Sequence, residues 1–223
     1  MVRHSHEHQC WDARMTRVLI LGASGQVAEQ ALGLLSDTDF DLTLFARDEG
    51  KLTNAPAGAD VVAGDVLDAE QLDAAIQGQD IVYANLAGDV DQQAKAIVRS
   101  MTAAVVHRLV FVTALGIYDE VPGEFGRWNR SQIGSMLGPY RTAADIIEAS
   151  DLDYTILRPA WLTDDEEIDY EVTEKGEPFQ GTEVSRRSVA ALVVDILHDP
   201  SKWSRSSLGI DKPGTDGDKP SFM

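Results

Sequence analysis

The sequence predicts an α/β fold, a doubly wound and mostly parallel sheet with helices on both faces. Two observations predict it. Short apolar runs alternate with segments of helical periodicity along most of the 223 residues, as in right-handed β–α–β crossovers. The first apolar run also leads directly into a glycine-rich turn and then a helix. A chain of this length suits one such domain with a small substrate lobe formed by later loops.

The glycine turn follows a first strand predicted at residues 18–21. Gly22 permits a tight turn, and Gly25 lets the backbone approach a pyrophosphate because it has no Cβ. The next helix, which begins near Val27, holds phosphates through its free N–H groups and partial positive charge. Ala28 takes the third glycine position, where a small residue still allows helix–strand packing. The motif predicts a dinucleotide site; a glycine turn between two core elements is the alternative.

A second strand is predicted at residues 41–46, and Arg47 and Asp48 follow it. An acidic residue near this point usually binds the ribose 2′-hydroxyl of NAD, whereas an arginine accommodates the 2′-phosphate of NADP. Because a guanidinium recognises phosphate through a bidentate fork, Arg47 predicts NADP in preference to NAD. Two alternatives to this interpretation stay open. One is that Asp48 binds the ribose hydroxyl itself or caps the next turn. The other is that Arg47 forms only a surface ion pair.

The third and fourth strands are predicted at residues 59–64 and 79–84. Asp65 and Val66 follow the third strand, where a carboxylate can accept from the adenine amino group and an apolar side chain can pack on the ring. Capping the helix at 69–76 is the competing role for the loop that holds Asp65. The small residues after the fourth strand, Asn85-Leu86-Ala87-Gly88, allow close approach to the ribose and the diphosphate.

The second half of the chain continues with a helix at 92–104 and a fifth strand at 108–113. Residues 114–138, rich in glycine and aromatic residues, are predicted to form a loop that acts as a substrate lid. An irregular covering segment is the alternative. Five further elements and a tail are predicted: a helix at 140–150, a sixth strand at 154–158, an acidic hairpin or flap at 164–183, a helix at 185–197 capped by Ser185, a strand at 207–210 and a loop or mobile tail at 211–223.

Composition excludes several classes of function. The net charge is −18, whereas nucleic-acid binding needs a basic footprint, so no nucleic-acid partner is expected. No apolar run is long enough to span a membrane, and the absence of a signal-peptide core predicts a cytoplasmic protein. The single cysteine, Cys10, fits a reducing compartment. In the N-terminal tail, residues 1–15, His4, His6, His8 and Cys10 are metal-ligand types, but no second cluster is present and a plain tail, pinned by Trp11, is favoured.

The motifs GASGQVA, FARD, GDV, NLAG, RLVFVTALGIY and ASDLDYTILRPAWL resemble the atypical short-chain dehydrogenase/reductases. Within them the chain looks like the NmrA-like and NAD(P)H-binding group, which includes flavin and biliverdin reductases. The resemblance implies a single NAD(P)-binding Rossmann domain over residues 16–210. It also implies cofactor contacts at Gly22, Ser24, Gly25, Gln26, Val27, Arg47, Asp65, Val66, Leu86, Ala87, Gly88, Thr113, Arg158, Pro159 and Ala160. Substrate contacts are expected at Tyr118, Trp128 and Trp161.

The larger superfamily uses a Tyr-x-x-x-Lys pair to exchange a proton with an alcohol or carbonyl. Anchored on ASDLDYT, the tyrosine position holds Met136 and the lysine position holds Tyr140, and no Tyr-x-x-x-Lys occurs anywhere in the chain. Thr113, Tyr118 and Tyr140 are the catalytic candidates, each with a structural role as the alternative. We expect an NAD(P)H-dependent oxidoreductase with a flat, small-molecule acceptor such as a flavin or quinone. A non-catalytic NAD(P)-binding sensor and a homodimeric assembly stay open. An epimerase- or dehydratase-like enzyme is disfavoured, because that chemistry normally retains the tyrosine.

Overall fold

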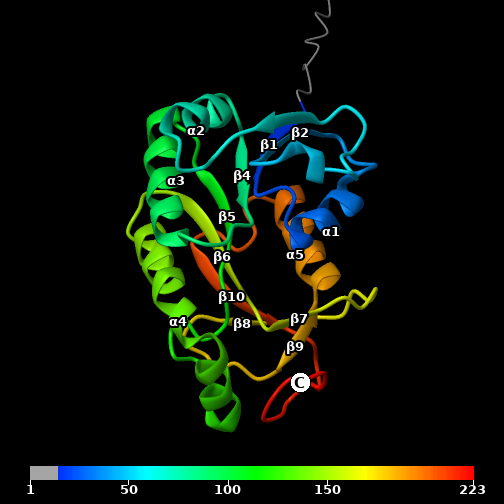
Figure 1. Cartoon of the computed structure of the whole chain (residues 1–223), viewed down its shortest axis with the longest axis vertical. Coiled ribbons are helices and arrows are strands. Elements are labelled where there is room, and N and C mark those ends of the chain that lie inside the picture. The colour runs from blue at the N-terminus through cyan, green and yellow to red at the C-terminus, as the bar shows by residue number, and fades with distance from the viewer. Residues whose placement is uncertain (1–14) are drawn as a thin grey trace, which may run out of the picture.

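The computed structural model describes residues 15–223, and in that part of the chain eight strands form one sheet. Their order is β3-β2-β1-β4-β5-β6-β10-β8, and every neighbouring pair is parallel except β10 and β8 (Figure 1). The strands are β1 (Thr16–Leu21), β2 (Phe40–Ala46), β3 (Asp60–Ala63), β4 (Ile81–Ala84), β5 (Arg108–Val112), β6 (Asp153–Pro159), β8 (Glu171–Glu174) and β10 (Ser206–Asp211). This is the Rossmann-like sheet that the sequence predicts.

Helices cover both faces of the sheet. Helices α1 (Gln26–Leu35) and α5 (Arg186–His198) pack against each other on one face, while α2 (Ala69–Ile76), α3 (Val90–Ala104) and α4 (Gly123–Glu148) follow one another on the opposite face (Figure 1). Alternate residues of β1 therefore enter different cores. Val18 and Ile20 belong to the cluster under α1 and α5, and Leu19 and Leu21 to the cluster under the other helices.

The segment predicted as a loop lid, residues 114–138, is largely helical. Helix α4 begins at Gly123 and runs without interruption to Glu148, so it includes the separate helix predicted at 140–150. The prediction of a long irregular loop is therefore wrong. The prediction rests on the glycine and aromatic content of the segment, and glycines such as Gly134 and Gly138 disfavour a helix interior. Helix α4 nevertheless continues through them and through Pro139, because packing at both of its ends overrides that preference.

The acidic segment 164–183 does not form a hairpin with itself. Its strand β8 pairs antiparallel with β10, whereas β9 (Glu183–Ser185) pairs parallel with β7 (Trp161–Thr163) in a separate small sheet. Arginines at the start of α5 hold the acidic stretch, through ion pairs of Arg186 with Asp164 and of Arg187 with Glu166. Ser185 caps α5 as predicted, since its hydroxyl accepts from the N–H of Ser188.

The C-terminal residues 212–223 pack as a loop beside β9. The main-chain N–H of Ser221 donates to Glu183, and Gly181 forms an isolated bridge with Asp216. The tail residues His4, His6, His8, Cys10 and Trp11, about which metal binding and packing were considered, lie outside the described residues. Among residues 15–223, no helix combines the length and the apolar character needed to cross a membrane.

Candidate functional site

The turn between β1 and α1 requires glycine at its first position. Gly22 has a φ of +76°, and a Cβ there would lie 2.2 Å from the main-chain oxygen of Asn85. The N–H of Gly22 donates to the carbonyl of Phe45 at 3.0 Å, which ties the turn to the end of β2. The turn is therefore held between the ends of β2 and β4, the place where open α/β sheets bind ligands.

The N-terminus of α1 is left open toward this place. Gly25 is its N-cap and supplies no capping side chain, so the N–H groups of the first turn have no side-chain acceptor. A Cβ on Gly25 would lie 2.4 Å from the Nδ2 atom of Asn85. The missing side chain at Gly25 therefore makes room for the Asn85 amide against the turn. The uncapped helix N-terminus beside it favours an anion through the helix dipole.

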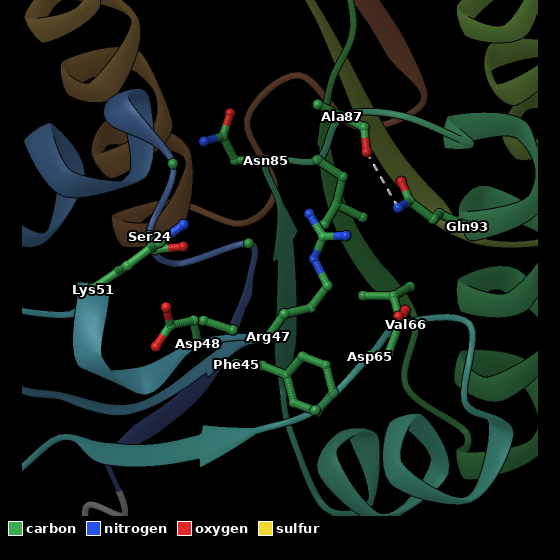
Figure 2. Close-up of a pocket in the computed structure, with 15 residues that line it drawn as sticks. Ser24, Phe45, Arg47, Asp48, Lys51, Asp65, Val66, Asn85, Ala87 and Gln93 are labelled. Carbon is green, nitrogen blue, oxygen red and sulfur yellow. Dashed lines mark hydrogen bonds between the residues drawn. The ribbon is translucent and has the colours of Figure 1, made fainter.

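A cleft runs across the carboxyl ends of β1, β2, β3 and β4 (Figure 2). It brings together eight predicted cofactor residues: Gly22, Ser24, Gly25, Arg47, Asp65, Val66, Leu86 and Ala87. The lining also contains Asp48, which is predicted as an alternative contact to the ribose hydroxyl, and Asn85, which is predicted as part of the small-residue turn. Five further lining residues are not predicted as contacts: Phe45, Ala46, Lys51, Gly64 and Gln93. The predicted contacts Gln26, Val27, Gly88, Thr113, Arg158, Pro159 and Ala160 are not part of its lining.

Arg47 and Lys51 supply positive charge to the cleft. Figure 2 shows the Arg47 side chain extending from the end of β2 toward the middle of the cleft. Within residues 15–223, neither Arg47 nor Lys51 has a hydrogen bond or an ion pair with another side chain. Asp48 does not neutralise them by pairing, since its Oδ1 atom accepts from the N–H of Gly50 and caps the short 3-10 helix Glu49–Lys51. The capping alternative for Asp48 is therefore observed.

On the opposite side of the cleft, the carboxylate of Asp65 and that of Asp68, three residues later, accept hydrogen bonds from main-chain N–H groups. Asp65 accepts from the N–H of Leu67 through Oδ1, and Asp68, not Asp65, caps α2. Val66 is buried and lies in the lining beside Asp65. Gln93 donates to the carbonyl of Ala87 and so joins α3 to the turn after β4 (Figure 2). This side of the cleft combines an apolar wall with polar groups at its rim.

All three catalytic candidates have hydroxyl groups that donate to protein atoms, and none of the three is part of the cleft lining. Thr113 is buried and its hydroxyl donates to the carbonyl of Leu157 at 2.9 Å. Tyr118 donates to Glu148 at 2.8 Å, and Lys175 lies over its ring. Burial raises the pKa of the Tyr118 phenol above its ordinary value, and the Glu148 carboxylate raises it further.

Tyr140 is the candidate nearest to the cleft. Its hydroxyl donates to the carbonyl of Leu86, a cleft residue, at a distance of 3.4 Å. Burial raises the pKa of the Tyr140 phenol, so this group is a weaker acid than an exposed tyrosine. The structure therefore places a neutral phenol at the edge of the cleft on the α4 side.

Arg158 does not offer its side chain to a cofactor. The side chain is completely buried, and its guanidinium pairs with Glu120 and donates to Ser207 and to the carbonyl of Thr173. Because no surface of this side chain is exposed, a contact of Arg158 with a nicotinamide would have to come from its main chain, and the cofactor contact of Arg158 stays a prediction. Pro159 and Ala160 are buried beside it, and their cofactor contacts stay predictions.

The predicted substrate residues Trp128 and Trp161 meet each other. Their ring centroids are 4.8 Å apart, and the Nε1 atom of Trp161 donates to the buried side chain of Asn129 at 2.9 Å. Trp128 comes from α4 and Trp161 from β7, so this pair joins the long helix to the small sheet. Tyr118 is apart from this pair. It lies in the loop before α4, and its hydroxyl reaches Glu148 at the other end of that helix.

These features fit a dinucleotide phosphate. Glycines bring Asn85 close to an uncapped helix N-terminus, and two basic side chains without a partner among residues 15–223 line the same cleft in a chain whose net charge is −18. An anion there would meet local positive potential although the whole molecule repels it. Gly22, Ser24 and Gly25 would hold a pyrophosphate, and Arg47 and Lys51 a further phosphate.

Comparison with solved structures places the chain among dinucleotide-binding proteins. The model of the family described as NAD(P)H-binding matches residues 22–200. A Rossmann-fold NAD(P)-binding family protein from Shigella flexneri is 50% identical, with 94% of this chain and 100% of that chain covered and a TM-score of 0.82. A wide-type short-chain dehydrogenase/reductase from Veillonella parvula DSM 2008, solved in complex with NADP, is 31% identical at the same coverage, with a TM-score of 0.87.

Two relatives in sequence carry more specific names. The uncharacterized sugar epimerase YhfK of Bacillus subtilis (strain 168) is 29% identical over 219 residues, with 85% of this chain and 92% of the relative covered. The NAD(P)H azoreductase of Xenophilus azovorans is 26% identical over 196 residues, with 82% of this chain and 64% of the relative covered.

Proposed function

Since the chain belongs to the NAD(P)H-binding family, we propose that it is an NADPH-dependent oxidoreductase that reduces a flat small-molecule acceptor. The observation that carries the proposal is the cleft itself, in which glycines, an uncapped helix N-terminus and basic side chains without partners in the described part of the chain converge. The likeness to an azoreductase supports the class of reaction.

NADP is proposed in preference to NAD because of the charges at the end of β2. Arg47 and Lys51 lie on the cleft without acidic partners among the described residues, while Asp48 is engaged in a helix cap. A ribose 2′-phosphate matches two cations, whereas a 2′-hydroxyl would leave both unpaired. The similar protein solved with NADP supports the same choice.

The acceptor is proposed to be a molecule that takes its protons from solvent. No Tyr-x-x-x-Lys pair occurs in the chain, Tyr118 is bonded to Glu148, and burial raises the pKa of Tyr140. When bound, NADPH supplies a hydride, and quinones, flavins and azo compounds accept one without a strong protein acid. The protein's own part is to hold the two reactants close together and to exclude water from the cleft.

The direct test mixes the purified chain with NADPH or NADH and follows the nicotinamide absorbance after addition of duroquinone, FMN or 4-aminoazobenzene. We expect NADPH to be oxidised faster than in the same mixture without protein. NADH should be oxidised more slowly than NADPH at the same concentrations. Binding of NADP⁺ by calorimetry is measured on the same sample. Tight binding with no oxidation above background for any acceptor would contradict the enzyme and favour a non-catalytic NAD(P)-binding sensor.

A further inference from the structure

Helix α4 has an inward-facing stripe that is buried at both ends and open in the middle. Phe125 and Asn129 are buried near its start, and Ala143, Ala144 and Ile147 are buried near its end. Between these two groups, Met136 exposes 51% of its surface. An exposed methionine is unremarkable on the outer face of a helix, so its direction on α4 decides what the exposure means.

By helical periodicity, Met136 lies on the same side of α4 as the buried residues. At about 100° per residue, its direction lies within about 20° of those of Asn129 and Ile147. The residues of the opposite face, such as Ser131 and Gly134, are exposed as expected. Met136 is therefore an inward-facing apolar side chain that solvent, instead of protein, covers on one side.

The reason for this opening is that α4 passes from one core to the other at this point. Ile133 and Trp128 pack against the cluster under α1 and α5, while Leu137 and Tyr140 pack against the cluster on the opposite face of the sheet. Met136 lies between them along the helix and is among the exposed large hydrophobic residues. The middle of α4 thus lies where the helix passes from one core cluster to the other, and about half of the surface of Met136 is exposed there.

The exposed stretch around Met136 is linked to the cofactor cleft through Tyr140. Tyr140 lies one helical turn after Met136 on the same stripe, and its hydroxyl contacts the carbonyl of Leu86, which lines the cleft. The carboxyl ends of β1 and β4, on which the cleft is built, point to this same edge. A molecule that lies under Met136 is therefore next to whatever the Leu86 side of the cleft holds.

We propose that the middle turn of α4 is the wall against which the acceptor packs, with Met136 as its main apolar contact and Tyr140 at the junction with the cofactor cleft. This proposal rests on the proposed oxidoreductase function. The chemistry of the wall selects the occupant: a thioether and a neutral phenol favour an uncharged, flat ring system over a sugar or an anion. Quinones and neutral azo compounds are acceptors of this class.

The first test uses Met136→Trp to fill the space and Ser135→Trp as a matched control on the exposed side of the same turn. Binding of duroquinone to the NADP⁺-saturated protein is measured by calorimetry. We expect the Kd of duroquinone to rise about tenfold in Met136→Trp, because overpacking costs about 1–3 kcal/mol. Binding of NADP⁺ by either variant, and of duroquinone by the control, should stay within about twofold of wild type. An unchanged Kd in Met136→Trp would overturn the proposal.

The second test measures whether a bound acceptor protects position 136 from chemical labelling. Met136→Cys and Ser135→Cys are prepared in a Cys10→Ser background, so that each protein has one thiol. The rate of labelling by N-ethylmaleimide is compared with and without 4-aminoazobenzene on NADP⁺-saturated protein. We expect the azo compound to slow labelling of Met136→Cys and to leave labelling of Ser135→Cys unchanged. Equal rates with and without the azo compound in Met136→Cys would overturn the proposal.

The two levels of proposal fail differently. If wild type oxidises NADPH with duroquinone but the Met136 variants behave as wild type, the wall is wrong and the oxidoreductase stands. If wild type binds NADP⁺ yet neither binds nor reduces any acceptor, the proposed function is wrong and the wall falls with it.

Discussion

The Nη1 atom of Arg158 and the Oε1 atom of Glu120 lie 2.5 Å apart, and both side chains are buried. Glu120 also accepts from the N–H groups of Gly116 and Tyr118, so its carboxylate joins the loop after β5 to the interior of β6. Removing one partner of a buried ion pair leaves a charge without compensation, which is far more costly than losing an exposed pair.

We therefore expect Glu120→Gln to lower the free energy of unfolding by about 3–5 kcal/mol in urea titrations. Its matched control is Asp119→Asn, the same chemical change one residue earlier. Asp119 forms an exposed ion pair with Arg130, so this variant should lose no more than about 1 kcal/mol. Equal effects of the two substitutions would show that the buried pair does not stabilise the fold.

Local patterns in the sequence predicted most of the sheet and its first helices. The bounds of α2, Ala69–Ile76, match the apolar periodicity and the capping aspartate before it, and the glycine turn lies at the cleft as expected. Such features depend on neighbours in sequence, which a single chain displays.

Contacts between segments that are far apart in the sequence could not be predicted from local patterns. Asn85 constrains Gly25 from the end of another strand, and Arg158 finds its partner on a loop that precedes it by 38 positions. Helix α4 was misjudged for a related reason, since the residues that bury Phe125 and Asn129 come from elements far along the chain. Propensity is a weak guide where packing of this kind decides.

Stability should depend on pH through Asp211. This side chain is buried at the end of β10, accepts from the N–H of Gly181, and lies opposite Glu171 of β8. Burial raises the pKa of Asp211 to about 7, and the neighbouring Glu171 carboxylate raises it as well. The folded state therefore holds a proton that the unfolded chain loses near pH 4, so the stabilisation is complete below that pH and is lost as pH rises toward 7.

We expect Asp211→Asn to remove this part of the pH dependence. The difference in unfolding free energy between variant and wild type should grow by about 2–4 kcal/mol in favour of the variant between pH 4 and 7.5. Urea titrations at several pH values measure it, with Asp218→Asn, an exposed acid of the same C-terminal segment, as the control. Parallel pH profiles for wild type and Asp211→Asn would contradict the assignment.

Cofactor preference should depend on Arg47. Arg47→Ala is expected to weaken NADP⁺ binding by about ten- to a hundredfold, because a hydrogen bond to a charged group contributes about 1.5–3 kcal/mol. NAD⁺, which lacks the 2′-phosphate, should bind within about twofold of wild type. Calorimetric titration of both cofactors decides between these outcomes, and Arg127→Ala, whose exposed arginine pairs with Glu124 on α4, is the control. A parallel loss of affinity for NADP⁺ and NAD⁺ would remove Arg47 as the discriminating residue.

Two glycines of the first helical segment should respond in opposite ways to the same substitution. Gly33 lies inside α1 with no atom near the position of a Cβ, so Gly33→Ala should raise the free energy of unfolding by up to about 1 kcal/mol and leave NADP⁺ binding unchanged.

Gly25 has an extended backbone that alanine adopts freely, but its Cβ would meet the Asn85 amide at 2.4 Å. Because a side chain can rotate away, Gly25→Ala should fold, with its Asn85 displaced into the space where the pyrophosphate would lie. We expect its Kd for NADP⁺ to rise about tenfold or more. Urea titration and calorimetry on both variants separate the two effects, and wild-type affinity in Gly25→Ala would mean that the phosphates do not approach the helix N-terminus.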